Sequence, residues 1–433
     1  MTAPWDLPAP EPAPGPRVPL AGLDRAALAS FLEGLGQPAW RGTQLFEGLY
    51  RHRWAAWERF TAFGKDLRAQ LEACADLGRP RIVDSATSAD GSTKHAFRLV
   101  DGHTVEGVHM PYFQRGSRAS LRCAPTPAPP RPSEAELPQG LSSGGSRASL
   151  RSAPTARADH PAPPRPAQAE PARGFESGDA QGVAGALERV TLCLSSQVGC
   201  AMGCTFCATG QMGILRNLTA GEIVGQVLAM LDHHGHPPGV PVNLVFMGMG
   251  EPLHNLDHVM AAFRVLSEPG GLAIPPRRIT LSTAGLVSGI QRLGALSPRP
   301  RLAVSLNATT DAARSRIMPV NRVWGLDALA AALAGFPLGR GERITLEFVL
   351  LKGLTDSLED GRRLAAFARR FPSKVNLIPF NPHEGAGFEP PEDDRLEALC
   401  ALLAKAGLTV SVRRSRGQDV AGACGQLVRR ARA

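Results

Sequence analysis

The stretch from Val190 to Cys207, VTLCLSSQVGCAMGCTFC, decides the fold of this chain. It begins with a short apolar run, which predicts a buried strand, and it ends with three cysteines spaced C-x3-C-x2-C. Three thiolates on one loop can hold three corners of a cubane iron–sulfur cluster and leave the fourth iron open. The alternative is a zinc site completed by a distant histidine, or a set of buried free thiols, although zinc sites more often use paired C-x2-C spacings.

The sequence that follows this stretch alternates between apolar runs and helical patterns. Strands are expected at 190–194, 242–247, 278–282, 301–306, 343–350, 374–379 and 408–412. One helix begins at the capping box formed by Thr219 and Glu222, and others are expected at about 255–267, 326–335, 357–371 and 392–406. This alternation predicts an α/β fold with parallel strands, as a barrel or an open sheet, and with the site in the loops after the strands.

Composition divides the chain into five regions. Residues 1–19 are rich in proline and predict a disordered leader, whereas 20–111 carry helical and then strand patterns and predict a small accessory domain. Residues 112–187 predict a low-complexity Pro/Arg-rich insertion, in which the heptapeptide GSRASLR at 116–122 returns at 145–151. The alternating region covers 188–412, and a basic C-terminal segment covers 413–433.

Composition also excludes several classes of protein. Of the 433 residues, 43% are hydrophobic and 20% are charged, which allows a sizeable core and excludes wholesale disorder. No apolar run reaches the roughly 18 residues of a membrane-spanning helix and no signal peptide is visible, so we expect a cytoplasmic protein. In such a chain the eight cysteines favour metal or redox chemistry over a disulfide scaffold.

The formal net charge of +9 is concentrated in two segments. Residues 115–173 hold nine arginines against four acidic residues, and 411–433 hold six arginines against one aspartate. Both segments can meet phosphate backbones, and a solvated run of charge is the alternative interpretation, favoured for the first segment by its disordered composition.

Further motifs follow in order: CLSSQVGC at 193–200, CATGQMG at 207–213, GMGEP at 248–252 and ACGQL at 423–427. Together they resemble the RlmN/Cfr family of radical S-adenosylmethionine (SAM) RNA adenine methyltransferases. The resemblance extends from about Leu20 to Leu427 and is interrupted by the insertion. It implies a partial parallel (β/α) barrel of the radical SAM type with a small N-terminal α+β accessory region.

The resemblance implies two sets of cofactor residues. Cys200, Cys204 and Cys207 match the ligands of one 4Fe-4S cluster, whose open iron binds SAM. The positions that match SAM contacts are Gly250, Glu251, Ser282, Ser305, Leu306, Asn307 and Asn381. Asn307 departs from the family, which commonly has histidine there. If each position is considered alone, the alternative to a SAM contact is a glycine-rich turn at 248–250 and an ordinary helix or turn cap at Ser282 and at Asn381.

Three further residues match the family's reaction centre. Cys424 aligns with the cysteine that one SAM molecule methylates, and a second SAM then activates that methyl group for addition to the RNA base. Cys193 aligns with the resolving cysteine, which forms a transient disulfide with Cys424, and Glu106 aligns with the proton-accepting glutamate. The alternatives are small buried hydrophobic residues for the cysteines and a surface strand residue for Glu106.

The resemblance therefore implies a methyltransferase that modifies carbon 2 of adenosine in 23S ribosomal RNA (rRNA) and in tRNA, with an external electron donor such as flavodoxin. The basic C-terminal segment and the helical pattern at 23–76 are the expected RNA contacts. The nearest alternative is the branch of the family that methylates carbon 8. A methylthiotransferase would need a second cysteine triplet, which is absent, and a cluster-bearing RNA-binding sensor would not need the Cys193 and Cys424 pair.

Overall fold

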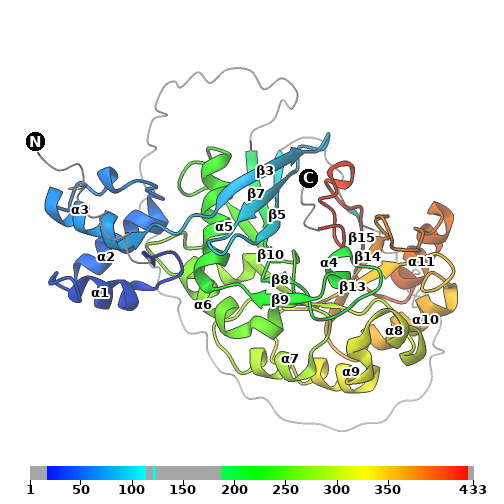
Figure 1. Cartoon of the computed structure of the whole chain (residues 1–433). Coiled ribbons are helices and arrows are strands. Elements are labelled where there is room, and N and C mark those ends of the chain that lie inside the picture. The colour runs from blue at the N-terminus through cyan, green and yellow to red at the C-terminus, as the bar shows by residue number, and fades with distance from the viewer. Residues whose placement is uncertain (1–16, 114–119, 123–186, 428–433) are drawn as a thin grey trace, which may run out of the picture. The chain divides into compact units, whose positions relative to one another are not determined.

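The structure is a computed structural model that describes residues 17–113, 120–122 and 187–427. All of these residues belong to one compact unit (Figure 1). Most of the predicted leader and of the predicted insertion lies outside the described residues, as does the end of the basic segment.

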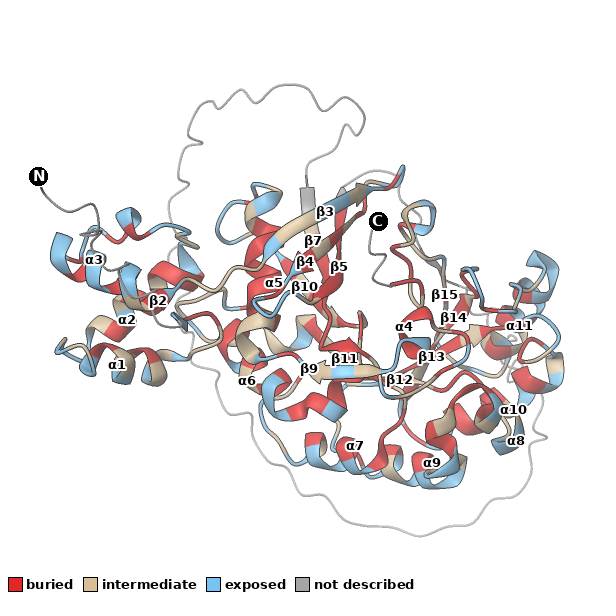
Figure 2. Ribbon diagram, viewed as in Figure 1, coloured by how far each residue is buried: buried red, intermediate tan, exposed pale blue. Residues whose placement is uncertain are grey.

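Parallel strands form the centre of the protein, as the alternating pattern predicted. In sheet order they are β7 (Leu187–Cys193), β10 (Val242–Phe246), β11 (Ile279–Thr283), β12 (Arg301–Ser305), β13 (Ile344–Leu350), β14 (Ser373–Pro379) and β15 (Val410–Arg413). Each pairs in parallel with the next, and most of their residues are buried, as expected for a parallel sheet (Figure 2). The α/β prediction is confirmed.

Helices follow most of these strands. They are α5 (Ala220–His233), α6 (Leu256–Ser267), α7 (Val287–Gly294), α8 (Asp311–Ile317), α9 (Leu326–Ala334), α10 (Leu358–Ala368) and α11 (Asp393–Lys405). Five match predicted helices, and α5 begins at the predicted capping box of Thr219 and Glu222. Helices α7 and α8 were not predicted, because they span only eight and seven residues and therefore show little helical periodicity.

Antiparallel strands extend this sheet at both ends. β3 (Arg81–Thr87), β4 (Thr93–Arg98) and β5 (Thr104–Phe113) form a meander whose last strand pairs with β7, so that Val108 faces Cys193. β6 (Ser120–Arg122) pairs with β15 at the opposite end. The accessory strands and the central strands therefore form one continuous sheet of eleven strands, with β3 and β6 at its ends among the described residues.

The helical pattern at 23–76 folds into a small cluster of helices. These are α1 (Arg25–Glu33), α2 (Arg41–Phe46), a π-helical turn (Glu47–Arg51), a 3-10 turn (Trp57–Arg59) and α3 (Lys65–Cys74). The cluster is closed by a short parallel pair, β1 (Val18–Pro19) with β2 (Ala75–Asp76). The apolar residues that predicted it form its core, apart from the half-buried Leu35. No helix in the described part of the chain is both long and apolar enough to cross a membrane.

Candidate functional site

A cavity lies at the carboxyl ends of the parallel strands, where the fold predicted a site. The three motif cysteines line it, together with six of the seven residues that match SAM contacts: Gly250, Glu251, Ser282, Ser305, Asn307 and Asn381. Leu306 is the exception, because its side chain is fully buried and does not line the cavity. Residues from four strand ends and from the cysteine loop thus converge on one space.

The cysteine loop connects β8 (Gln197–Gly199) to the short helix α4 (Ala208–Gln211). Cys200, Cys204 and Cys207 are free thiols, and burial raises the pKa of each, to about 12 for Cys200. Such thiols stay protonated unless a bound cation stabilises the thiolates. A donor set of three cysteine sulfur atoms in one cavity, with Cys204 buried and the other two residues partly buried, suits an iron–sulfur cluster.

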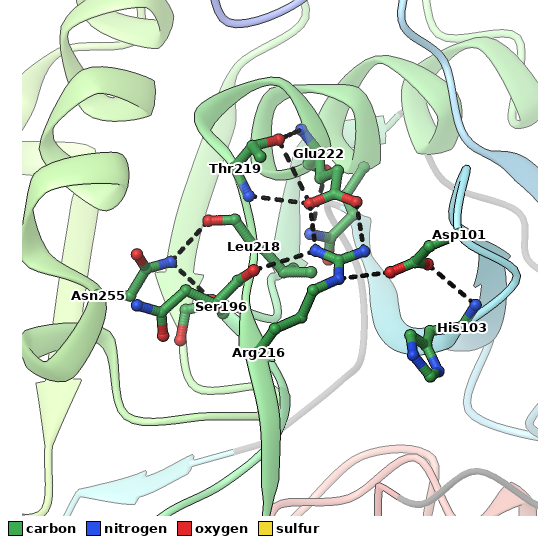
Figure 3. A network of polar contacts seen from close by, with 10 residues as sticks. Asp101, His103, Ser196, Arg216, Leu218, Thr219, Glu222 and Asn255 are labelled. Carbon is green, nitrogen blue, oxygen red and sulfur yellow. Dashed lines mark hydrogen bonds and ion pairs between the residues drawn. The ribbon is translucent and has the colours of Figure 1, made fainter.

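A polar network holds the hairpin that carries the cysteine loop (Figure 3). Arg216, on β9 (Ile214–Asn217), donates two hydrogen bonds to the carboxylate of Glu222 at 2.8 and 2.9 Å. Its Nε donates to Asp101, in the turn between β4 and β5, at 2.5 Å. Asn255 donates to the carbonyls of Ser196 and Leu218 on either side of the hairpin. The loop is therefore tied to α5, to α6 and to the accessory strands.

Glu251 lies in the loop after β10, and 2% of it is exposed. The backbone N–H groups of Leu253 and Ala284 donate to its two carboxyl oxygens at 3.0 and 2.7 Å. Burial raises the pKa of Glu251 to about 7, against the effect of these hydrogen bonds. A cationic or hydroxyl-bearing ligand in the cavity would stabilise the ionised form.

Only glycine fits the backbone conformation and the close packing at position 250. Its φ of +102° is in the region that favours glycine, and an added Cβ would lie 2.6 Å from the side chain of Gln197. Gln197 in turn accepts a hydrogen bond from the backbone N–H of Glu251 at 2.8 Å. The glycine therefore brings the loop after β10 against the cysteine hairpin.

The side-chain amide of Asn307 lines the cavity and also forms a hydrogen bond with the backbone of β13. Its Oδ1 accepts from the backbone N–H of Val349 at 3.0 Å, and its φ of 57° is a left-handed value that asparagine tolerates. The fully buried Arg314 pins the same loop, because it donates to the carbonyls of Leu306 and Ala284 at 3.0 and 2.6 Å. Arg314 was missed in the sequence analysis, where an arginine in a short helix gives no signal of burial.

The segment that carries Cys424 is bound directly to the cysteine loop. The backbone N–H of Ala208 donates to the carbonyl of Gly425 at 2.8 Å, and the Thr209 hydroxyl donates to the carbonyl of Leu427 at 2.6 Å. Asn381 donates to the carbonyl of Cys424 at 3.0 Å. Although Asn381 also lines the cavity, its observed bonds position the Cys424 segment.

Cys193 and Cys424 come together although they lie at opposite ends of the central region. Cys424 lines the cavity of the cluster cysteines, and it also lines a smaller adjoining hollow that contains Cys193. Both are free thiols. Burial raises the pKa of Cys193 to about 12, and Cys424 raises it further, whereas Arg413 opposes the shift.

Arg413 lines both the main cavity and the hollow of the two thiols. Its position in the basic C-terminal segment had predicted a contact to RNA phosphates instead. The proximity of Cys424 raises the pKa of its guanidinium, so Arg413 stays cationic. Arg416 is also used in hydrogen bonds within the fold, because it donates to the backbone carbonyls of Pro111 and Asp90. Arg414, by contrast, is exposed.

Glu106 is buried on β5 rather than exposed on the surface. Its carboxylate pairs with Lys94 Nζ at 3.1 Å. It lies two residues from Val108, and therefore on the same face of the strand, and Val108 lines the hollow that contains Cys193. The strand pairing thus places Glu106 two residues from the partner of Cys193 despite the long insertion between them in sequence, although Glu106 itself lines neither the cavity nor the hollow.

Comparison with known proteins agrees with this geometry. Residues 194–365 match the Radical SAM superfamily, and residues 18–77 match the ribosomal RNA large subunit methyltransferase N-terminal domain. The fold and the three-cysteine loop define the chain as a radical SAM enzyme, a class that uses a 4Fe-4S cluster and SAM.

The similarity to individual relatives covers nearly the whole chain. The dual-specificity RNA methyltransferase RlmN of Pelobacter propionicus is 37% identical over 94% of this chain and 95% of its own length. RlmN 2 of Myxococcus xanthus is 37% identical over 98% and 94%. A radical SAM methyltransferase of known structure from Sphaerobacter thermophilus superposes with a TM-score of 0.75 at 34% identity, over 95% of this chain and 99% of that one. The chain belongs to the RlmN family of radical SAM methyltransferases.

Proposed function

We propose that this enzyme methylates carbon 2 of adenosine in 23S rRNA and in tRNA, through a methyl group carried on Cys424. RNA is supported as the substrate by the relatives, which are named dual-specificity RNA methyltransferases. The observation that carries the proposal is the position of Cys424, which lines both the cavity of the cluster cysteines and the hollow of Cys193.

Cys200, Cys204 and Cys207, which line the cavity, are proposed to hold three irons of the cluster and would leave one iron without a protein ligand. When bound, the cluster would supply the electron needed to cleave SAM to a carbon radical. The buried carboxylate of Glu251 and the amide of Asn307, which line the cavity, are proposed to bind donor groups of SAM. Gly250 leaves the space that this contact needs.

Cys424 is proposed to act first as a nucleophile that accepts a methyl group from SAM. A thiolate is the reactive form of a cysteine, and the cationic Arg413 lines the same hollow as Cys424. A methyl carrier is needed because an adenine ring carbon that bears hydrogen is not nucleophilic and cannot take a methyl group from SAM directly. The bonds from Ala208, Thr209 and Asn381 keep this carrier beside the cluster loop.

Cys193 is proposed to release the product after the methylene carbon has joined Cys424 to the base. Its thiolate attacks the Cys424 sulfur, so that a sulfur–sulfur bond forms while the bond from Cys424 to the methylene carbon breaks. The carbon keeps the electron pair and takes a proton to become the product methyl group. Before this attack the radical adduct must lose one electron, for which the oxidised cluster would be the acceptor, and the proton of the ring carbon, for which Glu106 is the proposed acceptor. An external thiol reductant then restores the two cysteines.

The helical cluster at 18–77 is proposed as the main RNA contact, since it matches an rRNA methyltransferase N-terminal domain. Of the C-terminal arginines in the described part of the chain, Arg414 is the one exposed enough to meet a phosphate. Reduction of the cluster by a donor such as flavodoxin, and a place of action in the cytoplasm, complete the proposal.

Mass spectrometry of RNA nucleosides tests this function. The anaerobically reconstituted enzyme is incubated with SAM, a reductant and separate transcripts of 23S rRNA and tRNA that lack the modification. The expected product is 2-methyladenosine in both RNAs, which chromatography separates from 8-methyladenosine. Exclusive 8-methyladenosine would assign the chain to the other branch of the family, and SAM cleavage without any methylated nucleoside would favour a sensor.

A further inference from the structure

A second group of metal-ligand side chains lies away from the site described above. Five of the eleven histidines gather where β4 and β5 meet the C-terminal end of α5: His95, His109, His233, His234 and His236. The radical SAM reaction uses none of them, and none lines the cavity or the hollow of the two thiols.

Three of these residues have the geometry of a shared metal ligand set. One nitrogen each from His95, His233 and His234 lie within 4.8 Å of one another. The ring centroids are 4.8, 5.1 and 5.2 Å apart, and each pair of rings is inclined by 69° to 75°. Three imidazoles around one ion, with metal–nitrogen bonds of 2.0–2.1 Å, have centroids about 4.5 to 5.2 Å apart.

The closest nitrogen pair is His95 Nε2 and His234 Nε2, at 2.9 Å. Two nitrogens about 2.05 Å from one ion are roughly 2.9 Å apart at a right angle and roughly 3.3 Å apart at a tetrahedral angle. This pair therefore fits the right angles of a square-planar or octahedral ion such as Ni²⁺. The three nitrogens lie up to 4.8 Å apart, and two ligands on opposite sides of one ion are roughly 4.1 Å apart, so the exposed ring of His233 must move toward the other two to complete the site.

The surroundings of His95 support a ligand role. Its Nδ1 is 2.7 Å from the Ser85 hydroxyl, which can accept a hydrogen bond from Nδ1–H. In that tautomer Nε2, the atom 2.9 Å from His234 Nε2, carries a lone pair that can bind a metal. Such a second hydrogen bond is what orients metal-binding histidines in proteins. Burial lowers the pKa of His95 to about 3 and that of His234 to about 4, so both rings are uncharged at neutral pH.

The site is reachable from solvent and offers neutral ligands. His233 is exposed, and His234 lines a surface hollow together with His109 and His236. The neighbouring carboxylate of Asp232 is bound by Arg53 and Arg79 at 3.3 and 2.7 Å. Imidazoles with water in the remaining positions suit the late first-row divalent metals rather than Mg²⁺ or Ca²⁺.

We propose that His95, His233 and His234 bind one late first-row divalent metal ion, of the class of Ni²⁺ and Zn²⁺, which links β4 to the end of α5. The ion would stabilise the folded state, because the three ligands come together only when the accessory strands have docked on α5. This site is independent of the iron–sulfur cluster.

The test uses the untagged holoenzyme with its cluster reconstituted, so that the cluster cysteines are occupied. Titration with Ni²⁺ is expected to show about one strong site, and the metal should raise the melting temperature. His233→Ala should weaken binding at least tenfold and abolish the thermal shift, and because His233 is exposed this change should not disturb folding. The matched control is His258→Ala, an exposed histidine on α6, which should leave both measurements unchanged.

X-ray absorption of the bound metal identifies its ligands. Nitrogen neighbours near 2.0–2.1 Å, with the scattering pattern of imidazole and no sulfur near 2.3 Å, are expected for Ni²⁺ and for Zn²⁺. Equal affinity in the original enzyme and in His233→Ala, absence of a strong site, or a sulfur neighbour would overturn the proposal. In the first two cases the histidines would form only a hydrogen-bonded cluster, and in the third the metal would occupy thiols.

Discussion

The three cluster cysteines and the thiol pair of Cys193 and Cys424 are assembled in opposite ways. The cluster cysteines occupy one loop of eight residues, so the chain brings them together without help from the rest of the fold. The thiol pair combines the last residue of the first central strand with a segment beyond the last one, and both must reach one hollow. The spacing of the three cluster ligands is thus a local property of the sequence, whereas the two thiols depend on the completed sheet.

The largest expected effect comes from removing one cluster ligand. Cys204→Ala should lose the iron-dependent absorbance and all methylation, because the cavity offers three thiols and a two-thiol remnant does not hold a cubane cluster. Iron content and absorbance after anaerobic reconstitution measure this. Cys74→Ala is the control, since this free thiol on α3 does not line the cavity. Full cluster content in Cys204→Ala would show that the loop does not hold the cluster.

Substitutions in the thiol pair should leave the cluster in place and stop the reaction at two different stages. Cys424→Ala should bind SAM and RNA but never form a protein–RNA adduct, because the methyl carrier is gone. Cys193→Ala should accumulate protein crosslinked to RNA, because the thiolate that displaces the tethered sulfur is missing.

A gel shift that survives denaturant and disappears after ribonuclease treatment detects the adduct. Normal release of methylated RNA by Cys193→Ala, with no adduct, would refute the resolving role of Cys193. In that event its burial would reflect packing alone.

A smaller effect is expected from Arg413→Met, which alters the charge beside the thiol pair. Arg413 lowers the pKa of Cys193 against the effect of burial, so its loss should raise that pKa. Release of the adduct should slow about tenfold at every pH between 7 and 10, because the pKa of Cys193 lies above this range and a rise of about one unit lowers the thiolate fraction by the same factor throughout it. Single-turnover rates between pH 7 and 10 would show this, and Arg413→Lys should restore most of the rate. An unchanged rate would assign Arg413 a packing role only.

The smallest effect concerns the support of the cluster loop. Arg216→Met removes the bonds to Asp101 and Glu222 and should destabilise folding by about 1 kcal/mol at pH 7, since the pair is partly exposed. Arg216 lowers the pKa of Asp101, so this stabilisation is present above about pH 4 and is lost as the pH falls through the lowered value.

Urea unfolding at pH 7 and at pH 3 measures the difference between Arg216→Met and the original enzyme. Arg292→Met is the control, because its ion pair with Asp257 is largely exposed. A destabilisation that is the same at both pH values would mean that the pair with Asp101 does not contribute.

Much of the fold was predictable because its signals are local. Seven apolar strands, five helices and a capping box can be recognised in short windows of sequence, and the structure confirms them. The short helices α7 and α8 were missed because they span too few residues to show a period. The resemblance to the RlmN/Cfr family also predicted which residues meet in the cavity, apart from Leu306, whose side chain is buried in the core.

The features that escaped prediction depend on contacts between distant segments. Arg413 and Arg416 have the composition of a basic tail, and only the fold shows that one faces the thiols and the other binds the backbone near Asp90. The histidine cluster draws on β4, β5 and the end of α5, and only His233, His234 and His236 are neighbours in sequence. Pairing of β4 and β5 beside β7 was needed to complete it.

The position of Cys193 on β7 determines whether Cys193 or Cys424 moves when the two thiols approach each other. β7 is hydrogen-bonded on both sides, antiparallel to β5 and parallel to β10, and Cys193 is paired with Val108 and Val245. The segment from 414 to 427 has no strand ladder and is held by single bonds such as that of Asn381 to Cys424. In hydrogen–deuterium exchange, amides of this segment should therefore exchange much faster than those of β7. The same difference means that the C-terminal segment moves, and β7 stays in place, when the two sulfur atoms approach each other.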